Sequence, residues 1–238
     1  MKRLFLSDLH LLCEDTGPFL RFKECLQQEA RRVDEIYILG DLVEMWIGDD
    51  DDSKIAAALK QVLRSTTADC PVFIMHGNRD FLFGEAFTGA TGVTMLADPF
   101  LTTDGILLCH GDTLCTDDLS YQRLRQTLRD PQWQAEILQK TLNERKVFGA
   151  GLRAQSRSSN ANKPTNIMDV NAKATQALMS HYGAHTLIHG HTHRPGRHEH
   201  DNFLRLVMGA WMHCGWLCRQ NGSSFSLECF SLARRYEI

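Results

Sequence analysis

The sequence predicts an α/β fold, because short apolar runs that each end in a polar motif alternate with amphipathic helical patterns. Each run is apolar on both faces, which is typical of buried strands. The chain of 238 residues is long enough to form one substantial core that carries a smaller insertion. The predicted strands are Lys2–Leu6, Glu35–Leu39, Pro71–Met75, Ile106–Cys109 and Thr186–Ile188.

Two helices are predicted between the first three strands. The first is marked by apolar residues spaced three or four apart, namely Phe19, Phe22, Leu26, Ala30 and Val33. The second is capped by Ser53 and carries Ile55, Leu59, Val62 and Leu63. A repeated order of strand, polar loop and helix is that of an open α/β sheet, which binds ligands at the carboxyl ends of its strands. We therefore expect all five polar motifs to meet at one edge of the sheet.

The segment of residues 117–165 breaks this alternation. It contains two helical patterns, Leu119–Leu128 and Pro131–Phe148, with no strand between them, and a polar loop of residues 149–166 follows. We interpret the segment as a helical cap, with residues 1–116 and 166–238 as the core. Its nine basic and five acidic side chains give a net charge of +4, which leaves −7 for the rest of the chain. A basic cap over an acidic rim suits an anionic substrate, although a solvated helical surface would carry the same charges.

Composition excludes several classes of protein. With 26 basic and 29 acidic side chains the net charge is −3, so we expect neither a basic nucleic-acid coat nor any nucleic-acid partner. A hydrophobic fraction of 43% and a charged fraction of 23% are ordinary for a globular protein. No apolar run approaches the ~18 residues that span a bilayer, and polar residues interrupt any signal-peptide pattern at the start. The eight cysteines form no C-x-x-C pair and indicate reduced thiols in a cytosolic protein. We expect a monomer.

The polar motifs supply carboxylate, imidazole and amide groups but no thiolate. These candidate ligands are Asp8, His10, Asp41, Asn78, His110, His191 and His193. Such a set suits Mn²⁺, Fe²⁺ or Zn²⁺ in a reactive site better than a structural zinc. Seven ligands are too many for one ion, whereas two ions that share a bridging carboxylate would use them all. In D-x-H and H-x-H the alternate residues of an extended segment point the same way, so both members of each pair can reach one site.

Five motifs in the order SDLH, GDLVE, GNRD, HGD and GHTH cover residues 7–193 and resemble those of the calcineurin-like metallophosphoesterases. The resemblance implies a sandwich of β-sheets flanked by helices, with a helical cap, and a site for two divalent ions, for which we expect Mn²⁺. One ion would be held by Asp8, His10, Asp41 and His193, and the other by Asp41, Asn78, His110 and His191. It further implies that Asp41 bridges the ions and that a bridging hydroxide is the nucleophile. The implied catalytic residues are Asp41, Asn78, Arg79 and His191.

Arg79 departs from the wider family, in which a histidine follows the asparagine and assists the leaving group. An arginine stays protonated at neutral pH and cannot act as a general acid, but it can neutralise phosphate oxygens. A phosphomonoester leaving group, with a second pKa near 6, needs no added proton. Arg79 therefore favours cleavage of a pyrophosphate bond over cleavage of a simple phosphate ester.

Further motifs resemble the subfamily that hydrolyses UDP-2,3-diacylglucosamine in lipid A biosynthesis, namely WIGDD (46–50), HGDTLCTDD (110–118), RAQS (153–156) and IMDVN (167–171). This resemblance implies water attack on the α-phosphate, with UMP and 2,3-diacylglucosamine 1-phosphate (lipid X) as products. The implied substrate-binding residues are Asn78, Arg79, Asp118, Tyr121, Arg153, Ser156, Asn160, Lys163 and His191. Apolar cap residues that could contact the acyl chains, or equally serve ordinary packing, are Leu124, Leu128, Trp133, Ile137, Leu138 and Phe148.

A lipid-linked substrate would place the protein at the cytoplasmic face of the bacterial inner membrane, as a peripheral protein that contacts membrane lipid. The residues proposed for this contact are Arg123, Arg125, Arg129 and Trp133. Two other functions remain open: a metallophosphoesterase acting on a soluble nucleotide or dinucleotide, and a non-catalytic scaffold of the same fold. Asp49–Asp52 is interpreted as a solvated loop, and Asp80 is expected to orient a neighbouring histidine or arginine.

Overall fold

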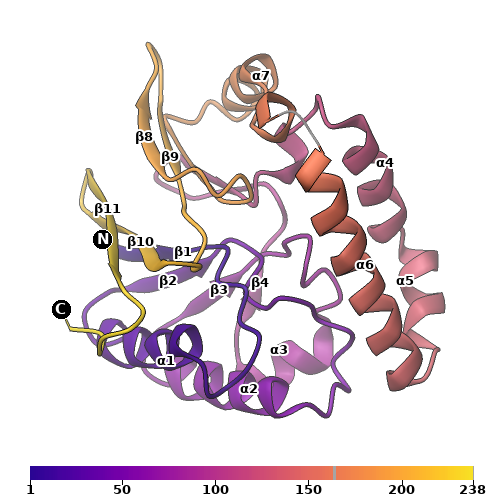
Figure 1. Cartoon of the computed structure of the whole chain (residues 1–238). Helices are drawn as coiled ribbons and strands as arrows, with labels where there is room; N and C mark the ends of the chain where they lie inside the picture. The colour runs from indigo at the N-terminus through magenta and orange to yellow at the C-terminus, as the bar shows by residue number, and fades with distance from the viewer. Residues whose placement is uncertain (163–164, 238) are drawn as a thin grey trace.

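The computed structural model describes residues 1–162 and 165–237, with side-chain detail for all of these except 159–162, 165 and 166. The chain forms two β-sheets that face each other (Figure 1). The first sheet has the strand order β11 (Ser224–Ser231), β10 (Cys214–Asn221), β1 (Lys2–Leu6), β2 (Glu35–Ile38), β3 (Val72–Ile74) and β4 (Thr94–Met95). The second has the order β5 (Phe100–Leu101), β6 (Ile106–Cys109), β7 (Thr186–His189), β9 (Leu204–Val207) and β8 (Gly196–Glu199).

The predicted sandwich of sheets flanked by helices is confirmed, but the expectation of one common sheet is wrong. Three of the five predicted strands, β1, β2 and β3, run parallel in the first sheet, whereas β6 and β7 run parallel in the second. Runs that are apolar on both faces show that a strand is buried, but they do not show which sheet it joins. The polar motifs still converge, because contacts between the loops after β6, β7, β1 and β2 join the two sheets at one rim.

Alternate residues of β1 show how the layers form. Phe5 faces the second sheet and packs in a cluster with Ile106 and Ile188. Leu4 and Leu6 point the other way, into a cluster that includes helical residues. This two-residue alternation gives the strand two buried faces, one against a sheet and one against helices.

Helices cover the outer face of each sheet. Below the first sheet in Figure 1 lie α1 (Gly17–Glu29), α2 (Lys54–Thr67) and α3 (Glu85–Thr91). The expected cap of α2 is present, since Ser53 Oγ accepts a hydrogen bond from the Ala56 amide at 3.3 Å. On the outer face of the second sheet, Met179 of α7 (Ala172–Tyr182) packs with Leu107 and Leu187. The chain also forms two short 3₁₀ turns, η1 (Asp112–Leu114) and η2 (Thr165–Met168).

Three further helices, α4 (Leu119–Leu128), α5 (Pro131–Leu138) and α6 (Leu142–Asn162), lie together beside the sheets (Figure 1). The prediction of one helix over 131–148 and a loop over 149–166 is wrong, because α5 ends at Leu138 and α6 continues to Asn162. The break is a capping box: Thr141 Oγ1 accepts from the Glu144 amide at 3.3 Å, and Glu144 Oε2 accepts from the Thr141 amide at 2.9 Å. Most of the segment interpreted as a polar loop, including Gly149 and Gly151, therefore lies within α6.

The acidic run at residues 49–52 forms the expected loop, in which Asp50 and Asp52 are exposed, but its side chains also make structural contacts that were not predicted. Asp49 holds the start of α3, where it accepts hydrogen bonds from the Gly84 amide at 3.1 Å and the Phe87 amide at 2.7 Å. Asp50 pairs with Arg145 of α6 through both carboxylate oxygens, at 2.7 and 2.5 Å. Asp52 lies 2.9 Å from Lys146. Arg145 and Lys146, two of the basic residues of the cap segment, therefore form ion pairs with the core.

Within the described residues, no helix combines the length and the apolar character that a membrane span requires.

Candidate metal centre

Backbone conformation singles out one set of residues. Across residues 1–162 and 165–237, the non-glycine residues with positive φ, from 49° to 65°, are Asp8, His10, Asp41, His191 and His193. All five belong to the seven ligands predicted from the sequence. Each left-handed non-glycine residue costs on the order of 1–3 kcal/mol, and such strain is concentrated at functional sites. The strained residues all lie just after strands β1, β2 and β7.

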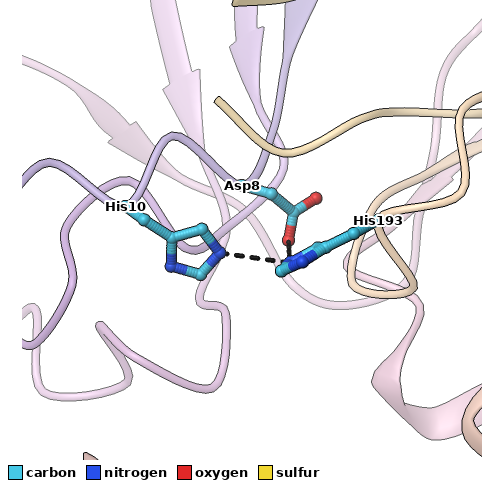
Figure 2. Close-up of side chains that lie close together, drawn as sticks. All are labelled: Asp8, His10 and His193. Atoms are coloured by element: carbon cyan, nitrogen blue, oxygen red, sulfur yellow. Dashed lines mark hydrogen bonds and ion pairs between the residues drawn. The ribbon is translucent and has the colours of Figure 1, made fainter. Parts of the chain in front are cut away.

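The first donor cluster consists of Asp8, His10 and His193 (Figure 2). His193 Nε2 lies 3.1 Å from His10 Nε2 and 3.3 Å from Asp8 Oδ1. Ligand atoms bound at about 2.1 Å and at right angles to one another lie roughly 3 Å apart. The spacing and the mixture of imidazole and carboxylate therefore fit a divalent cation.

A second donor cluster lies beside the first. Asn78 Oδ1 lies 3.0 Å from His110 Nε2 and 2.9 Å from His191 Nδ1. Asp41 stands between the clusters, because its Oδ1 lies 3.8 Å from His110 Nε2 and its Oδ2 lies 3.8 Å from His10 Nε2. A carboxylate with one oxygen toward each cluster has the geometry of a bridging ligand.

Hydrogen bonds from the surrounding backbone orient these donors. His110 Nδ1 donates to the Leu39 carbonyl at 2.8 Å, which leaves Nε2 free to act as a ligand. The Arg79 amide donates to Asp41 Oδ1 at 2.8 Å, and the His191 amide donates to Asp8 Oδ2 at 3.0 Å. Loops from both sheets thus fix one another across the site.

Asp80 acts on the backbone, and the expectation that it orients a histidine or arginine side chain is wrong. Its two oxygens accept hydrogen bonds from the amides of Gly77 and Leu42, both at 2.7 Å. These two hydrogen bonds hold the loop after β3 against the loop after β2, so that Asn78 and Asp41 are placed together. Burial and the nearby charge of Asp41 raise the pKa of Asp80 to about 6.

The electrostatics of the centre favour positive charge. Burial lowers the pKa of His110, but Asp41, Asp112 and Asp8 outweigh it and raise the value to about 9. Burial, together with the neighbouring His110, lowers the pKa of His191 to about 4, so this imidazole is neutral at pH 7 and offers a lone pair. A cation bound here would take the place of the proton on His110.

A polar cavity of about 400 Å³ opens directly onto both clusters. It is lined by six of the nine predicted substrate-binding residues, namely Asn78, Arg79, Asp118, Tyr121, Ser156 and His191. Arg153 does not line it and instead donates from Nε to Glu44 Oε1 at 3.1 Å. The predictions for Asn160 and Lys163 concern side chains outside the described residues.

Residues 1–195 match the family model described as calcineurin-like phosphoesterase. The chain belongs to this family. It is therefore a metallophosphoesterase that binds divalent metal. Two groups of described side chains are close enough to hold an ion: Asp8 with His10 and His193, and Asp8 with Asp41 and His110. The predicted family resemblance and fold class are confirmed.

The chain is also similar to curated proteins named UDP-2,3-diacylglucosamine hydrolase. It is 47% identical to the one from Aromatoleum aromaticum over 223 residues, which cover 89% of each chain. It is 42% identical to the one from Salmonella arizonae, over 98% of this chain and 100% of that one. Among solved structures, an archaeal phosphodiesterase shares the fold with a TM-score of 0.50 and 13% identity, covering 97% of this chain and 100% of that one.

Several site residues of this phosphoesterase also have structural contacts. Tyr121 donates from its hydroxyl to Asp112 Oδ2 at 2.7 Å. Asp118 caps α4 by accepting from the Tyr121 amide at 3.1 Å. Arg79 donates from Nη2 to Ser156 Oγ at 3.2 Å, which joins the loop after β3 to α6.

Sequence reasoning missed two acidic residues at the site. Asp112 is buried and accepts from both Tyr121 and Arg125 Nε, each at 2.7 Å. Glu44 lies between His10 and Arg153. Both lie inside motifs recognised in the sequence, Asp112 in HGD and Glu44 in GDLVE. The signal that could have found them is the second carboxylate of GDLVE and the carboxylate of HGD, to which no role was given.

A smaller and more apolar cavity of about 150 Å³ adjoins the polar one, with which it shares Asn78, Arg79, Tyr121 and Ser156. Its apolar lining comes from Met45, Leu124, Leu128 and Leu152. Of the six candidate acyl contacts, only Leu124 and Leu128 line it. Ile137 is buried in the core, Trp133 and Phe148 are partly buried against it, and Leu138 is 42% exposed.

Three of the four residues proposed for membrane contact also make contacts within the molecule, and their role at a membrane stays a prediction. Arg125 pairs with Asp112 at 2.7 Å. Arg129 donates from Nη2 to the carbonyls of His76 and Gly77, at 3.2 and 2.9 Å. Trp133 is partly buried against the core, and Arg123 alone of the four proposed residues is classed as exposed.

Proposed function

We propose that this chain hydrolyses the pyrophosphate bond of UDP-2,3-diacylglucosamine, with UMP and 2,3-diacylglucosamine 1-phosphate as products. The observation that carries the proposal is the pair of adjoining cavities, one lined mainly by charged and polar residues of the metal centre, the other with a larger apolar share in its lining. A nucleoside diphosphate attached to an acylated sugar has the same division between charged and apolar parts. The shared name of the curated relatives supports this substrate.

The donor set supports two ions. Asp8, His10, Asp41 and His193 would hold one, and Asp41, Asn78, His110 and His191 the other. Two divalent ions, for which we propose Mn²⁺, would supply a water of lowered pKa and neutralise charge on the phosphate oxygens. The bridging position of Asp41 supports a pair of ions over two independent sites.

Arg79 is proposed to bind phosphate oxygens of the substrate. It lines both cavities, and its Nη2 contact with Ser156 holds the guanidinium at the boundary between them. Attack on the α-phosphate breaks its bond to the bridging oxygen, which leaves with the sugar 1-phosphate. This leaving group needs no added proton, and a permanently charged arginine suits that chemistry.

The apolar cavity is proposed to hold part of an acyl chain, between α4, α6 and Met45. A substrate with two acyl chains resides in a membrane, so we also propose that the protein binds peripherally at the cytoplasmic face of the bacterial inner membrane. Flotation with vesicles that contain anionic lipid tests this, and recovery of all the protein in the soluble fraction at low salt would contradict it.

A UMP-release assay with Mn²⁺ tests the proposed reaction. The substrates are UDP-2,3-diacylglucosamine and UDP-N-acetylglucosamine, which carry the same nucleotide but differ in their acyl groups. We expect release from the first substrate at a kcat/KM at least about 100-fold higher, because only that substrate gains from the apolar cavity. Equal turnover of both substrates, or of an aryl phosphodiester, would instead indicate a phosphoesterase that acts on soluble nucleotides.

A further inference from the structure

Glu44 is a half-buried carboxylate where the metal centre meets α6. It follows Asp41 by three residues, in the loop after β2. A bridge between Leu11 and Val43, with the Glu44 amide donating to the Leu11 carbonyl at 3.0 Å, aligns this loop with the one that carries His10. The backbone register therefore sets the side chain of Glu44 beside a proposed metal ligand.

One oxygen of Glu44 faces His10. Oε2 lies 3.4 Å from His10 Nδ1, on the side of the ring opposite the Nε2 atom that faces His193. His10 Nδ1 is buried, and no described residue forms a hydrogen bond with it. A histidine that binds metal through one nitrogen almost always donates the other N–H to a carboxylate, a carbonyl or water. A shift of about 0.5 Å would give Glu44 and His10 a hydrogen bond of ordinary length.

The other oxygen of Glu44 faces the cap segment. Oε1 accepts from Arg153 Nε at 3.1 Å, and this contact joins residues 109 apart in the sequence. Arg153 lies three residues before Ser156, on the same face of α6, and Ser156 contacts Arg79. Because Arg153 uses only Nε here, its two terminal nitrogens have no partner among the described residues and are free to bind phosphate oxygens.

We propose that Glu44 is a positioning residue that fixes His10 through one carboxylate oxygen and Arg153 through the other. The affinity of the first donor cluster for metal and the binding of substrate phosphates by Arg153 of α6 then both depend on the side chain of Glu44. The part that concerns substrate rests on the proposed function. The part that concerns metal does not.

Two substitutions of Glu44 separate its contacts. Glu44→Ala removes both. Glu44→Gln keeps a carbonyl oxygen that can accept from His10 Nδ1, but it then turns an NH₂ group toward Arg153 Nε–H, so the second contact is lost. Arg153→Ala removes the second contact alone. Asp50→Ala is the matched control, because Asp50 also joins the core to α6, through Arg145, but does not appear in either donor cluster.

Titration with Mn²⁺, followed by the electron paramagnetic resonance signal of the free ion, measures the first contact. We expect Glu44→Ala to weaken one of two Mn²⁺ sites by about 10-fold or more, as is usual when such a partner is lost. Glu44→Gln, Arg153→Ala and Asp50→Ala should stay within about threefold of the wild type. Wild-type affinity for both ions in Glu44→Ala would overturn the role toward His10, provided that the thermal unfolding of the metal-free protein is unchanged.

Binding of inorganic pyrophosphate to the Mn²⁺-saturated proteins measures the second contact without turnover. Glu44→Gln and Arg153→Ala should each bind it about 10-fold more weakly and raise KM for the UDP-linked substrate by a similar factor, whereas Asp50→Ala should do neither. Wild-type pyrophosphate affinity in Glu44→Gln would overturn the role toward Arg153. If the wild type fails to release UMP, the proposed function fails, but both titrations still decide the role of Glu44.

Discussion

Asp41 is the residue on which both donor clusters depend, because its two oxygens face different clusters at equal distances of 3.8 Å. Asp41→Ala should therefore lower kcat for UMP release by roughly 1,000-fold or more and reduce bound Mn²⁺ at both sites. Metal analysis of the dialysed protein, run beside the activity assay, checks this. His193→Ala is the comparison, since His193 belongs to one cluster and its loss should weaken one site. Retention of two tightly bound ions by Asp41→Ala would exclude a bridging role.

Arg79 is the residue that favours a pyrophosphate bond as the bond that is cleaved. Arg79→Lys keeps the positive charge but loses the planar fork that binds phosphate through two donors. We expect kcat/KM for the UDP-linked substrate to fall by about 10-fold in Arg79→Lys and by about 100-fold in Arg79→Ala, a loss of roughly 1.4 and 2.7 kcal/mol in transition-state binding. The UMP-release assay measures both. An alanine variant as active as the wild type would remove Arg79 from the reaction.

The same residues show what the sequence could reveal about the site. Asp8, His10 and His193 lie in short motifs just after strands. Their role as ligands and their convergence at one edge could therefore be predicted from the sequence. The contact between Glu44 and Arg153 joins residues 109 apart. Nothing local marks such a pair, because an ion pair between distant residues depends on how helices and loops pack.

Elements that were predicted correctly are those with a strong local pattern. The buried runs that form β1, β2 and β6 were found because both of their faces are apolar. Strand β10, with the sequence CGWLCRQN, was missed because it mixes polar and apolar residues. This mixture reflects its place beside β11, which is partly exposed. The helix α6 was predicted as a loop from residue 149 onward, and it contains Gly149 and Gly151, which are poor helix formers. Its capping box, Thr141 and Glu144, was present in the sequence.

Those two glycines give a matched test of how α6 packs. A Cβ atom on Gly149 would lie 3.0 Å from Met45 Cγ and 3.4 Å from Ile47 Cγ2, whereas one on Gly151 meets nothing within 4 Å. Gly151→Ala should stabilise the protein by about 0.5–1 kcal/mol through helix propensity. Gly149→Ala should be less stable than Gly151→Ala by about 1–3 kcal/mol, because its Cβ would overpack against Met45. Urea unfolding measures both, and equal effects at the two positions would contradict the close approach of α6 to the core.

At the scale of the whole molecule, the metal centre joins the two sheets, because its donors follow strands of both. Saturation with Mn²⁺ at 100 times the dissociation constant should stabilise the folded state by about 2.7 kcal/mol per site, since metal binds the folded chain. Thermal unfolding before and after chelation by EDTA measures this, and activity should be lost at the same time. His193→Ala should show a smaller difference. An unfolding temperature that does not respond to Mn²⁺ would contradict the joined arrangement.

A second link between the sheets lies away from the metal centre. Arg3 on β1 pairs with Asp104, in the turn before β6, at 2.7 Å. Burial raises the pKa of Asp104, but hydrogen bonds from Arg3, Thr102 and Gln220 outweigh it and lower the value to about 2. Because the folded pKa lies below the unfolded value, the stabilisation is complete above about pH 4 and is lost as pH falls toward 2.

The size of this contribution is reduced by solvent, since 43% of the Asp104 side chain is exposed. We expect about 1 kcal/mol. Urea unfolding of the metal-free wild type and of Asp104→Asn at pH 6, 4 and 2.5 measures it. The wild type should be more stable by this amount at pH 6 and pH 4, and the difference should shrink at pH 2.5, because a protonated carboxyl no longer pairs with Arg3. A difference that stays constant across this range would show that Asp104 holds the sheets together by its shape and hydrogen bonds and not by its charge.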